Sequence, residues 1–257
     1  MRVLLFAPRP LTIPARRPLA LLTRKVRMIP WHQVGSTPLG GHAVLSLWRR
    51  DLDGRPPEFS LRINEPNLPV TELMNSRQNA SEQLLAERAI DALGRPAGSV
   101  LIGGLGMGYT LRAALDRLGD TARVTVAELL ADVVTWNREH MGDLAGRPLD
   151  DPRVSVHVGD VGELLSAAGR YDLILLDTDN GPEGTSREEN EELYSTAGLS
   201  RAHAALLPGG LLAVWSAFPS GEFTRRLERC GFDTKVTQAR AFGKRGARHV
   251  IWLARRP

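Results

Sequence analysis

A glycine-rich stretch at residues 99–110, Ser-Val-Leu-Ile-Gly-Gly-Leu-Gly-Met-Gly-Tyr-Thr, limits what this chain can fold into more than any other part of it. A short apolar run, Val100 to Ile102, leads directly into the glycines, and a helical pattern from Tyr109 to Leu118 follows at once. This order predicts a strand, a tight turn and a helix N-terminus. Because glycine has no Cβ, backbone N–H groups can approach a ligand closely, and the helix start adds partial positive charge. We therefore expect a nucleotide-like or carboxylate-bearing ligand at this turn.

The spacing of the glycines separates the possible ligands. Gly104, Gly106 and Gly108 read Gly-x-Gly-x-Gly, whereas a dinucleotide-binding turn reads Gly-x-Gly-x-x-Gly and would require a glycine where Tyr109 stands. The stretch is not a P-loop either, because no Gly-Lys-Ser/Thr sequence follows it. The spacing favours an S-adenosylmethionine site over an NAD site.

The rest of the chain alternates apolar strands with helical patterns. This order predicts an α/β fold with a doubly wound, mostly parallel, seven-stranded sheet that is covered on both faces. No helix separates the last two strands, near 232–238 and 248–253, so they should form an antiparallel hairpin at one sheet edge. The other expected strands are 123–127, 154–158, 171–176 and 211–216, and the expected helices include 131–140, 189–206 and 222–230.

Three regions are expected along the chain. Residues 1–30 form a basic, proline-rich arm, and residues 31–78 form a small antiparallel β domain, because alternating apolar patterns there are separated by turn residues. Residues 79–257 form the catalytic domain. Its first helix should cover residues 82–93, with Ser81 as N-cap and Gly94 at its end.

Charge is unevenly distributed along the chain. The first 30 residues hold seven basic residues and no acid, so the net charge of +4 becomes −3 for the remainder once these seven are set aside. A net acidic body makes nucleic acid an unlikely partner, although an RNA-associated module anchored by the arm stays as an alternative. One cysteine excludes an internal disulfide, and the histidines lack metal-ligand spacing, so we expect no metal. No apolar stretch is long enough for a membrane span, and we expect a cytoplasmic protein.

Acidic residues end three consecutive predicted strands behind the glycine turn. Glu128, Asp160 and Asp177 should meet at the carboxyl edge of the sheet, where open α/β sheets bind their ligands. A carboxylate at Glu128 can accept hydrogen bonds from both ribose hydroxyls, and one at Asp160 can accept from an adenine amino group. We expect Leu129 and Val161, beside them, to contact the same nucleoside, together with Gly104, Gly106, Met107 and Gly108.

Taken together, these motifs resemble the spermidine/spermine synthase-like branch of the class I S-adenosylmethionine-dependent methyltransferase superfamily. The resemblance implies a Rossmann-like methyltransferase sheet, a homodimer formed through the N-terminal region, and S-adenosylmethionine or its decarboxylated form as donor. The motifs that carry it are Gly-Gly-Leu-Gly-Met-Gly, Val-Ala-Glu128, Asp151-Pro152-Arg153-Val154 with Gly159-Asp160, the Asp177 loop ending in Gly181-Pro182, Leu193-Tyr194, and Leu207-Pro208-Gly209-Gly210-Leu211.

The chain departs from this family at the positions that handle the transferred group. Met107 stands where the family's first turn carries the aspartate that holds the ammonium of the aminopropyl group. Asn180 aligns with the family's base, although a shift of one residue would place Asp179 there. Of the family's N-terminal Tyr-(Gln/His)-Glu only Glu82 remains, and we expect Gln78, Glu82 and Asn180 to face the acceptor.

These departures determine the expected chemistry. A sulfonium donor needs mainly in-line positioning of the nucleophile and removal of its proton. Asp177, Asp179 and Tyr194 are the candidate catalytic residues. Without a carboxylate at Met107 the turn better suits the donor's own carboxylate, so we expect an S-adenosylmethionine-dependent transferase that methylates a small nucleophilic metabolite. The alternatives are aminopropyl transfer to a diamine from the decarboxylated donor, and a non-catalytic nucleoside-binding module.

Overall fold

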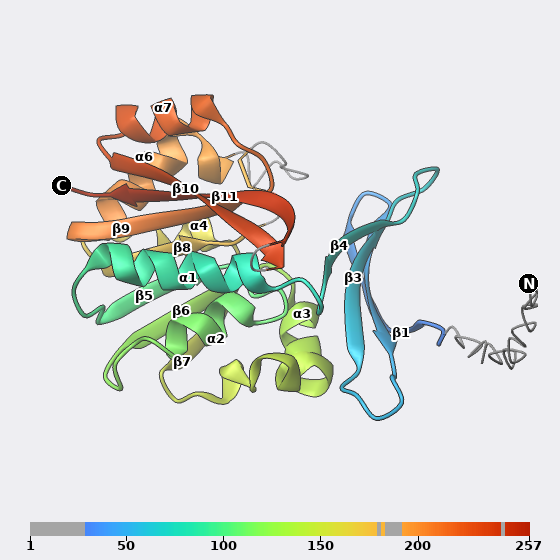
Figure 1. The fold of residues 1–257 in the computed structure, drawn as a ribbon. Helices are drawn as coiled ribbons and strands as arrows, with labels where there is room; N and C mark the ends of the chain where they lie inside the picture. Colours follow the sequence, from blue (N-terminus) through green and yellow to red (C-terminus); the bar gives the residue numbers. More distant parts are fainter. Residues whose placement is uncertain (1–28, 179–180, 183–191, 243–244) are drawn as a thin grey trace, which may run out of the picture.

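Two β-sheets make up the protein in a computed structural model, which describes residues 29–257 apart from 179–180, 183–191 and 243–244 (Figure 1). The smaller sheet is a four-stranded antiparallel meander in which each strand pairs with the next. Leu45, Leu47, Phe59 and Leu61 stand at alternate positions of its two middle strands and are buried, so that one face of the sheet carries apolar side chains. The strands are β1 (His32–Gly40), β2 (Ala43–Arg50), β3 (Glu58–Asn64) and β4 (Thr71–Asn75).

The larger sheet has seven strands in the order β10-β11-β9-β8-β5-β6-β7. Strands β5 to β9 pair in parallel, whereas β11 is antiparallel to both β9 and β10, which confirms the predicted C-terminal hairpin at the sheet edge. The fold is therefore the predicted α/β fold. The strands are β5 (Ser99–Gly103), β6 (Arg123–Glu128), β7 (Val154–Val158), β8 (Tyr171–Leu176), β9 (Leu206–Ser216), β10 (Asp233–Phe242) and β11 (Arg245–Arg255).

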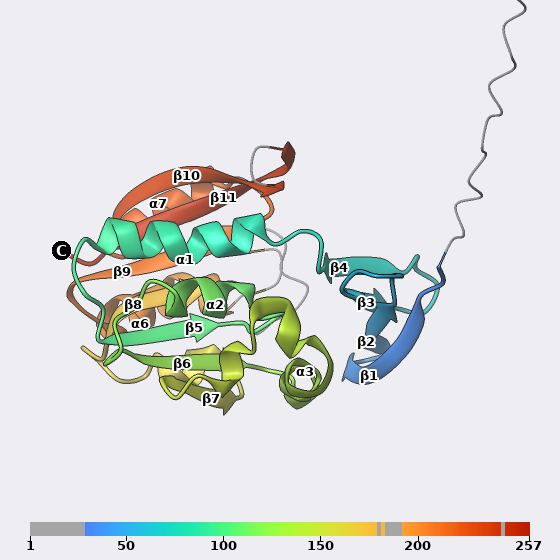
Figure 2. The same ribbon diagram turned by 60° about the horizontal axis from the view of Figure 1, so that its bottom comes forward.

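Helices cover both faces of the larger sheet (Figures 1 and 2). One face packs against α1 (Ala80–Leu93) and α2 (Tyr109–Leu115), and the other packs against α4 (Val161–Leu164), α6 (Thr196–Ala205) and α7 (Gly221–Arg229). Between β6 and β7, α3 (Ala131–Trp136) continues into a π-helical turn, Asn137–Met141, and two 3₁₀ turns, Gly142–Ala145 and Pro148–Asp150. A third apolar cluster joins α3 and the glycine turn to the smaller sheet.

Several predicted boundaries are wrong, each for a local reason. The long helix predicted to begin before α6 is interrupted at Ser195, whose hydroxyl accepts a hydrogen bond from the N–H of Gly198 and caps a new helix. The expected cap Ser81 lies inside α1 and is buried, whereas Asn79 precedes the helix. Gly94 ends α1 in the left-handed conformation, as predicted.

The described residues contain no helix long and apolar enough to cross a membrane. Nor do they bring together three or more His, Cys, Asp or Glu side chains in a metal-binding group. The predicted arm, residues 1–30, falls almost entirely outside the described part of the chain. The boundary predicted between residues 78 and 79 stays a prediction, with the two sheets on either side of it.

Candidate active site

The glycine turn closes directly against the end of β8. Gly104 has a φ of +90°, and a Cβ added to it would lie 2.3 Å from the carbonyl oxygen of Asp177. Its N–H donates to the carbonyl of Ala127 at the end of β6, at 2.9 Å. Only glycine satisfies both the positive φ and this close approach, so the turn brings the ends of β5, β6 and β8 together.

Asn137 holds the same turn from behind. Its side-chain amide donates to the carbonyl of Gly106 at 2.8 Å and to that of Val133 at 2.9 Å, and the residue is only 2% exposed. The π-helical turn that begins at Asn137 shifts the register of the helix at this point, and such turns often occur at functional sites. Asn137 therefore fixes the turn to α3, a role that the sequence pattern does not reveal.

Glu128 forms the centre of the expected nucleoside site. One carboxylate oxygen accepts from the N–H of Leu105 and the other from the N–H of Leu130, both at 3.0 Å. Asp160, at the end of the next strand, caps α4 by accepting from the N–H of Gly162 at 2.8 Å. Both carboxylates line one cavity, and their backbone partners hold them at its edge.

Asp177 and Glu82 form an acidic pair deeper in the same cavity. The hydroxyl of Thr110 donates to the Asp177 carboxylate at 2.5 Å. The hydroxyl oxygen of Thr110 also lies 3.2 Å from the backbone carbonyl oxygen of Glu82. Burial, reinforced by the charge of Glu82, raises the pKa of Asp177 to about 7. Burial also raises the pKa of Glu82. A carboxyl group that titrates near neutral pH inside a cavity is suited to take up a proton during a reaction.

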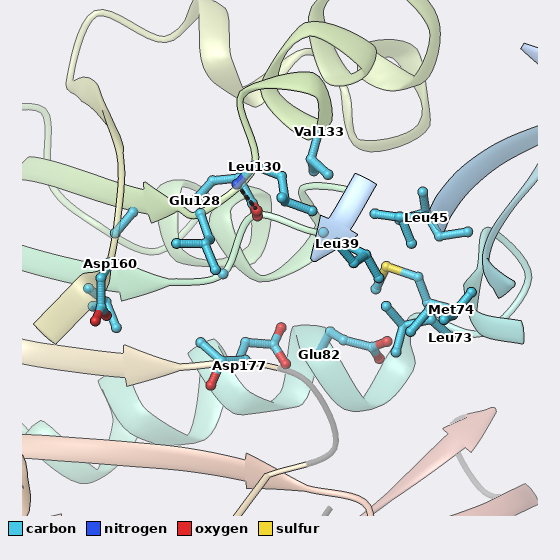
Figure 3. Close-up of a pocket in the computed structure, with 18 of the residues that line it drawn as sticks. Leu39, Leu45, Leu73, Met74, Glu82, Glu128, Leu130, Val133, Asp160 and Asp177 are labelled. Atoms are coloured by element: carbon cyan, nitrogen blue, oxygen red, sulfur yellow. Dashed lines mark hydrogen bonds between the residues drawn. The ribbon is translucent and has the colours of Figure 1, made fainter. Parts of the chain in front are cut away.

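The cavity runs from the larger sheet to the smaller one (Figure 3). Asp160 and Glu128 lie at one end, Asp177 and Glu82 lie between, and leucine side chains of the smaller sheet close the other end. Its empty volume, part of it open to solvent, is about 1190 Å³. Site residues predicted from the sequence that line it are Gly104, Gly106, Glu128, Leu129, Asp160, Val161, Asp177 and Glu82.

Other predicted residues lie elsewhere. The Met107 side chain is 1% exposed and packs in the apolar cluster beneath the smaller sheet, so it does not line the cavity as expected. Gly108 is the N-cap of α2, and Gln78 follows β4; neither is among the described residues that line the cavity. Tyr194 is buried, and its hydroxyl lies 2.8 Å from that of Thr178, which does line the cavity. The expected residues Asp179 and Asn180 lie outside the described residues.

Several residues in or beside the cavity have no direct signal in the sequence. Thr110 stands two residues after the glycine motif, at the start of α2. This position was the only sign in the sequence that its hydroxyl lies near the site. Trp215 of β9 belongs to the apolar core of the larger sheet and also lines the cavity. The apolar side chains of the smaller sheet were predicted to alternate in and out, but not to face this cavity: Leu39, Leu45, Leu61, Ile63, Leu73 and Met74.

These residues fit a sulfonium nucleoside. A carboxylate held by two backbone N–H groups beside a turn without Cβ atoms can bind a ribose, and Asp160 lies far enough along the edge to meet an adenine ring (Figure 3). A positively charged sulfur placed between these groups and Asp177 would face the acidic pair. The geometry therefore allows transfer of a carbon group from such a donor to a nucleophile at the leucine-lined end.

Comparison with known proteins agrees with this arrangement. Residues 84–219 match the family described as spermine/spermidine synthase domain. The spermine synthase of Arabidopsis thaliana is 29% identical over 145 residues, which cover 56% of this chain and 38% of that protein. This chain thus spans well under half the length of that relative.

Solved structures of similar fold include spermidine synthases. One is a spermidine synthase in complex with the transition state analogue AdoDATO, with a TM-score of 0.64 and 17% sequence identity. The matched region covers 90% of this chain and 82% of that spermidine synthase chain. Another is the spermidine synthase from Thermotoga maritima, with a TM-score of 0.63 and 18% sequence identity. The matched region covers 94% of this chain and 85% of that enzyme's chain. At this identity the likeness establishes the fold.

Proposed function

The chain belongs to the spermine/spermidine synthase family, and we propose that it transfers the aminopropyl group of decarboxylated S-adenosylmethionine to an amine. The observation that carries this proposal is the half-buried pair Asp177 and Glu82 between the nucleoside end and the acceptor end of the cavity. Two carboxylates there can attract an ammonium group and take its proton. This proposal replaces methyl transfer as the leading function, because the family match supports the aminopropyl alternative.

The transfer consists of one displacement. The acceptor amine first loses a proton to Asp177, whose raised pKa of about 7 makes it a better base than an ordinary aspartate. The amine lone pair then attacks the methylene carbon next to the sulfonium. A C–N bond forms, the C–S bond breaks, and its electron pair returns to sulfur, which leaves as a neutral thioether of the nucleoside.

Thr110 keeps this base in place. Its hydroxyl donates to Asp177 and so orients the carboxylate toward the cavity. Glu82 enters from the other side, at the start of α1, and its negative charge helps hold the protonated acceptor until the transfer begins. The predicted base at Asp179 or Asn180 stays an alternative to Asp177.

Product analysis tests the proposal. Purified protein is incubated with decarboxylated S-adenosylmethionine and a panel of primary amines, and the products are identified by mass spectrometry. We expect the mass of one aminopropyl group on an amine, together with one methylthioadenosine per transfer. Absence of both products with every amine, in protein shown by calorimetry to bind the donor, would contradict the proposal.

Methyl transfer from S-adenosylmethionine is the second candidate, and Met107 favours it. No carboxylate occupies this position to hold the donor's aminopropyl ammonium, because the methionine side chain is buried in the apolar cluster. Calorimetric titration with the two donors separates the candidates. Tighter binding of the decarboxylated donor supports aminopropyl transfer, and tighter binding of S-adenosylmethionine supports methyl transfer.

A further inference from the structure

Trp215 stands beside Asp177 at the ends of two neighbouring strands. Leu176 of β8 pairs in parallel with Val214 of β9, so the next residue of each strand, Asp177 or Trp215, lies at the same level of the sheet. Neighbouring strands lie about 4.8 Å apart. The carboxylate and the indole therefore start from adjacent backbone positions, and both residues line the cavity.

The two side chains also lie on the same face of the sheet. Trp215 and Leu175 belong to the apolar cluster that α1 and α2 cover, and Asp177, two residues after Leu175, has the same orientation because side chains alternate along a strand. Its hydrogen bond from Thr110 at the start of α2 agrees with this orientation. Glu82 lies in the first turn of α1, on this same face. The indole thus shares one part of the cavity with the acidic pair.

The surroundings of the indole favour attraction of a cation. Trp215 is only 9% exposed, and a tryptophan ring removed from water attracts a cation more strongly than an exposed ring. His249 of β11 lies edge-on to it, with ring centroids 4.7 Å apart. Burial lowers the pKa of His249, so this ring is uncharged at neutral pH and does not repel a cation held by its neighbour.

The sulfonium of the donor is the cation that reaches this place. With the ribose at Glu128 and the adenine toward Asp160, the sulfur on the ribose 5′ carbon extends toward Asp177 (Figure 3). Because the pKa of Asp177 is about 7, its carboxyl group is charged only part of the time at neutral pH. An indole ring attracts a cation whether or not Asp177 is ionised.

We propose that Trp215 binds the donor sulfonium through its indole ring, and that this contact makes the protein prefer the charged donor to the neutral thioether that remains after transfer. The attraction ends when the C–S bond breaks and the sulfur loses its charge, which favours release of the thioether. The inference rests on the proposed function, because it takes the donor to be a sulfonium nucleoside. It adds a binding residue that neither the sequence motifs nor the family match assigns.

Two ligands that differ in the charge on sulfur test the inference. Decarboxylated S-adenosylmethionine and decarboxylated S-adenosylhomocysteine share the nucleoside and the aminopropyl group, and differ in the methyl group that makes the sulfur positive. Each is titrated calorimetrically into the full-length native protein and into Trp215→Leu. We expect the ratio of the two affinities to fall about 5- to 30-fold in Trp215→Leu, the usual strength of a contact between a cation and an indole ring.

An unchanged ratio in folded Trp215→Leu would overturn the inference. A ring that only packs against the ligand, or that meets the ammonium group of both ligands, would support the two equally. The matched control is Trp48→Leu, because Trp48 is not among the described residues that line the cavity. This control should keep the native ratio.

Fluorination tests the same contact with little change in side-chain size, and it serves if thermal unfolding shows that Trp215→Leu is not folded. Fluorine withdraws electron density from the ring face, so 5-fluorotryptophan at all five tryptophan positions should lower the ratio in the native sequence. The same labelling of Trp215→Phe should leave the ratio of that variant unchanged. A native ratio that fluorination does not change would also overturn the inference.

These titrations require no turnover, so the two proposals fail separately. A protein whose ratio depends on Trp215 but which transfers no aminopropyl group contradicts the proposed function alone. A protein that transfers the group but whose ratio does not depend on Trp215 contradicts this inference alone.

Discussion

The two ends of the cavity are built in different ways. At the nucleoside end, Glu128 and Asp160 are held by backbone N–H groups at the carboxyl edge of a parallel sheet. At the acceptor end, the cavity wall consists of side chains from a separate antiparallel sheet. Backbone geometry thus defines what the first end binds, whereas side-chain identity alone defines the second.

This difference bears on specificity. The glycine turn leaves little freedom, because a side chain at Gly104 would collide with the backbone of Asp177. The apolar side chains of the smaller sheet that line the cavity can be exchanged without any change in the fold, since they stand on the strands of an antiparallel sheet. A family with this architecture can keep one donor and change its acceptor.

The largest effect is expected at Asp177, where the two ends meet. Asp177→Asn removes the base but keeps an oxygen that can accept from Thr110. We expect aminopropyl transfer to slow by about 10²- to 10⁴-fold, the usual contribution of a general base. Steady-state kinetics with a saturating amine measures the loss.

Asp53→Asn is the control, because this aspartate is exposed in a turn of the smaller sheet and should keep full activity. Donor affinity of Asp177→Asn, measured by calorimetry, should stay near the native value. If Asp177→Asn retains native turnover, Asp177 is not the base and the 179–180 segment becomes the place to look.

More of the nucleoside end of the cavity than of the acceptor end could be predicted from the sequence. The glycine spacing and the acids that end β6, β7 and β8 are contiguous motifs, so their convergence follows from sheet topology alone. The wall at the acceptor end depends on how one sheet docks on another, which involves contacts between residues far apart in the sequence. Alternation identified an apolar face there but not what that face covers.

The next effect is on stability and depends on pH. The pKa of Asp177 is raised to about 7 in the folded protein, above its ordinary value of 3.8, so the folded state binds this proton more tightly than the unfolded state. Native stability should therefore fall as the pH rises from about 4 to about 7. Above that range Asp177→Asn should be more stable than the native protein by on the order of 4 kcal/mol.

Urea unfolding at pH 4.5 and at pH 8 measures this difference, because the advantage of Asp177→Asn should be largely absent at the lower pH. Asp53→Asn, an exposed change in a turn of the smaller sheet, is measured in parallel as the control. A constant difference between native protein and Asp177→Asn at both pH values would mean that Asp177 does not titrate in this range.

A smaller effect is expected at the nucleoside end. Glu128→Gln removes the charge from a group that accepts from the N–H of Leu105 and of Leu130 and that we expect to hold the ribose. Hydrogen bonds to charged groups contribute about 1.5 to 3 kcal/mol, so donor affinity should fall about 10- to 100-fold. Calorimetry with methylthioadenosine measures it, and Glu139→Gln, an exposed change on the π-helical turn, should leave it unchanged.

Met107 shows what sequence comparison alone cannot resolve. Its position in the glycine motif predicted contact with the donor, but the turn directs its side chain into the cluster beneath the smaller sheet. A residue inside a ligand-binding motif can thus belong to the packing between the two sheets. The missing carboxylate is visible in the sequence, whereas the direction of the side chain depends on the docking of the second sheet.

The smallest effect should separate the two ends most cleanly. A Cβ at Gly35 of β1 would lie 2.4 Å from the indole nitrogen of Trp136 on α3, so Gly35→Ala forces one of these elements to move. Strand β1 is the edge strand of its sheet and pairs with β2, whereas α3 is anchored in the core of the larger sheet through Val134. We therefore expect β1 to move and α3 to stay in place. The shift displaces the wall at Leu39, and amine affinity should fall about tenfold, within the usual cost of overpacking.

Donor affinity of Gly35→Ala should change by less than about twofold, because Glu128 and the glycine turn lie on the anchored side. Gly119→Ala is the matched control, since a Cβ there would meet nothing within 4 Å. A parallel loss of donor and amine affinity in Gly35→Ala would show that α3 moves instead of β1. The two ends would then be one mechanical unit, and an acceptor could not be exchanged without weakening the donor.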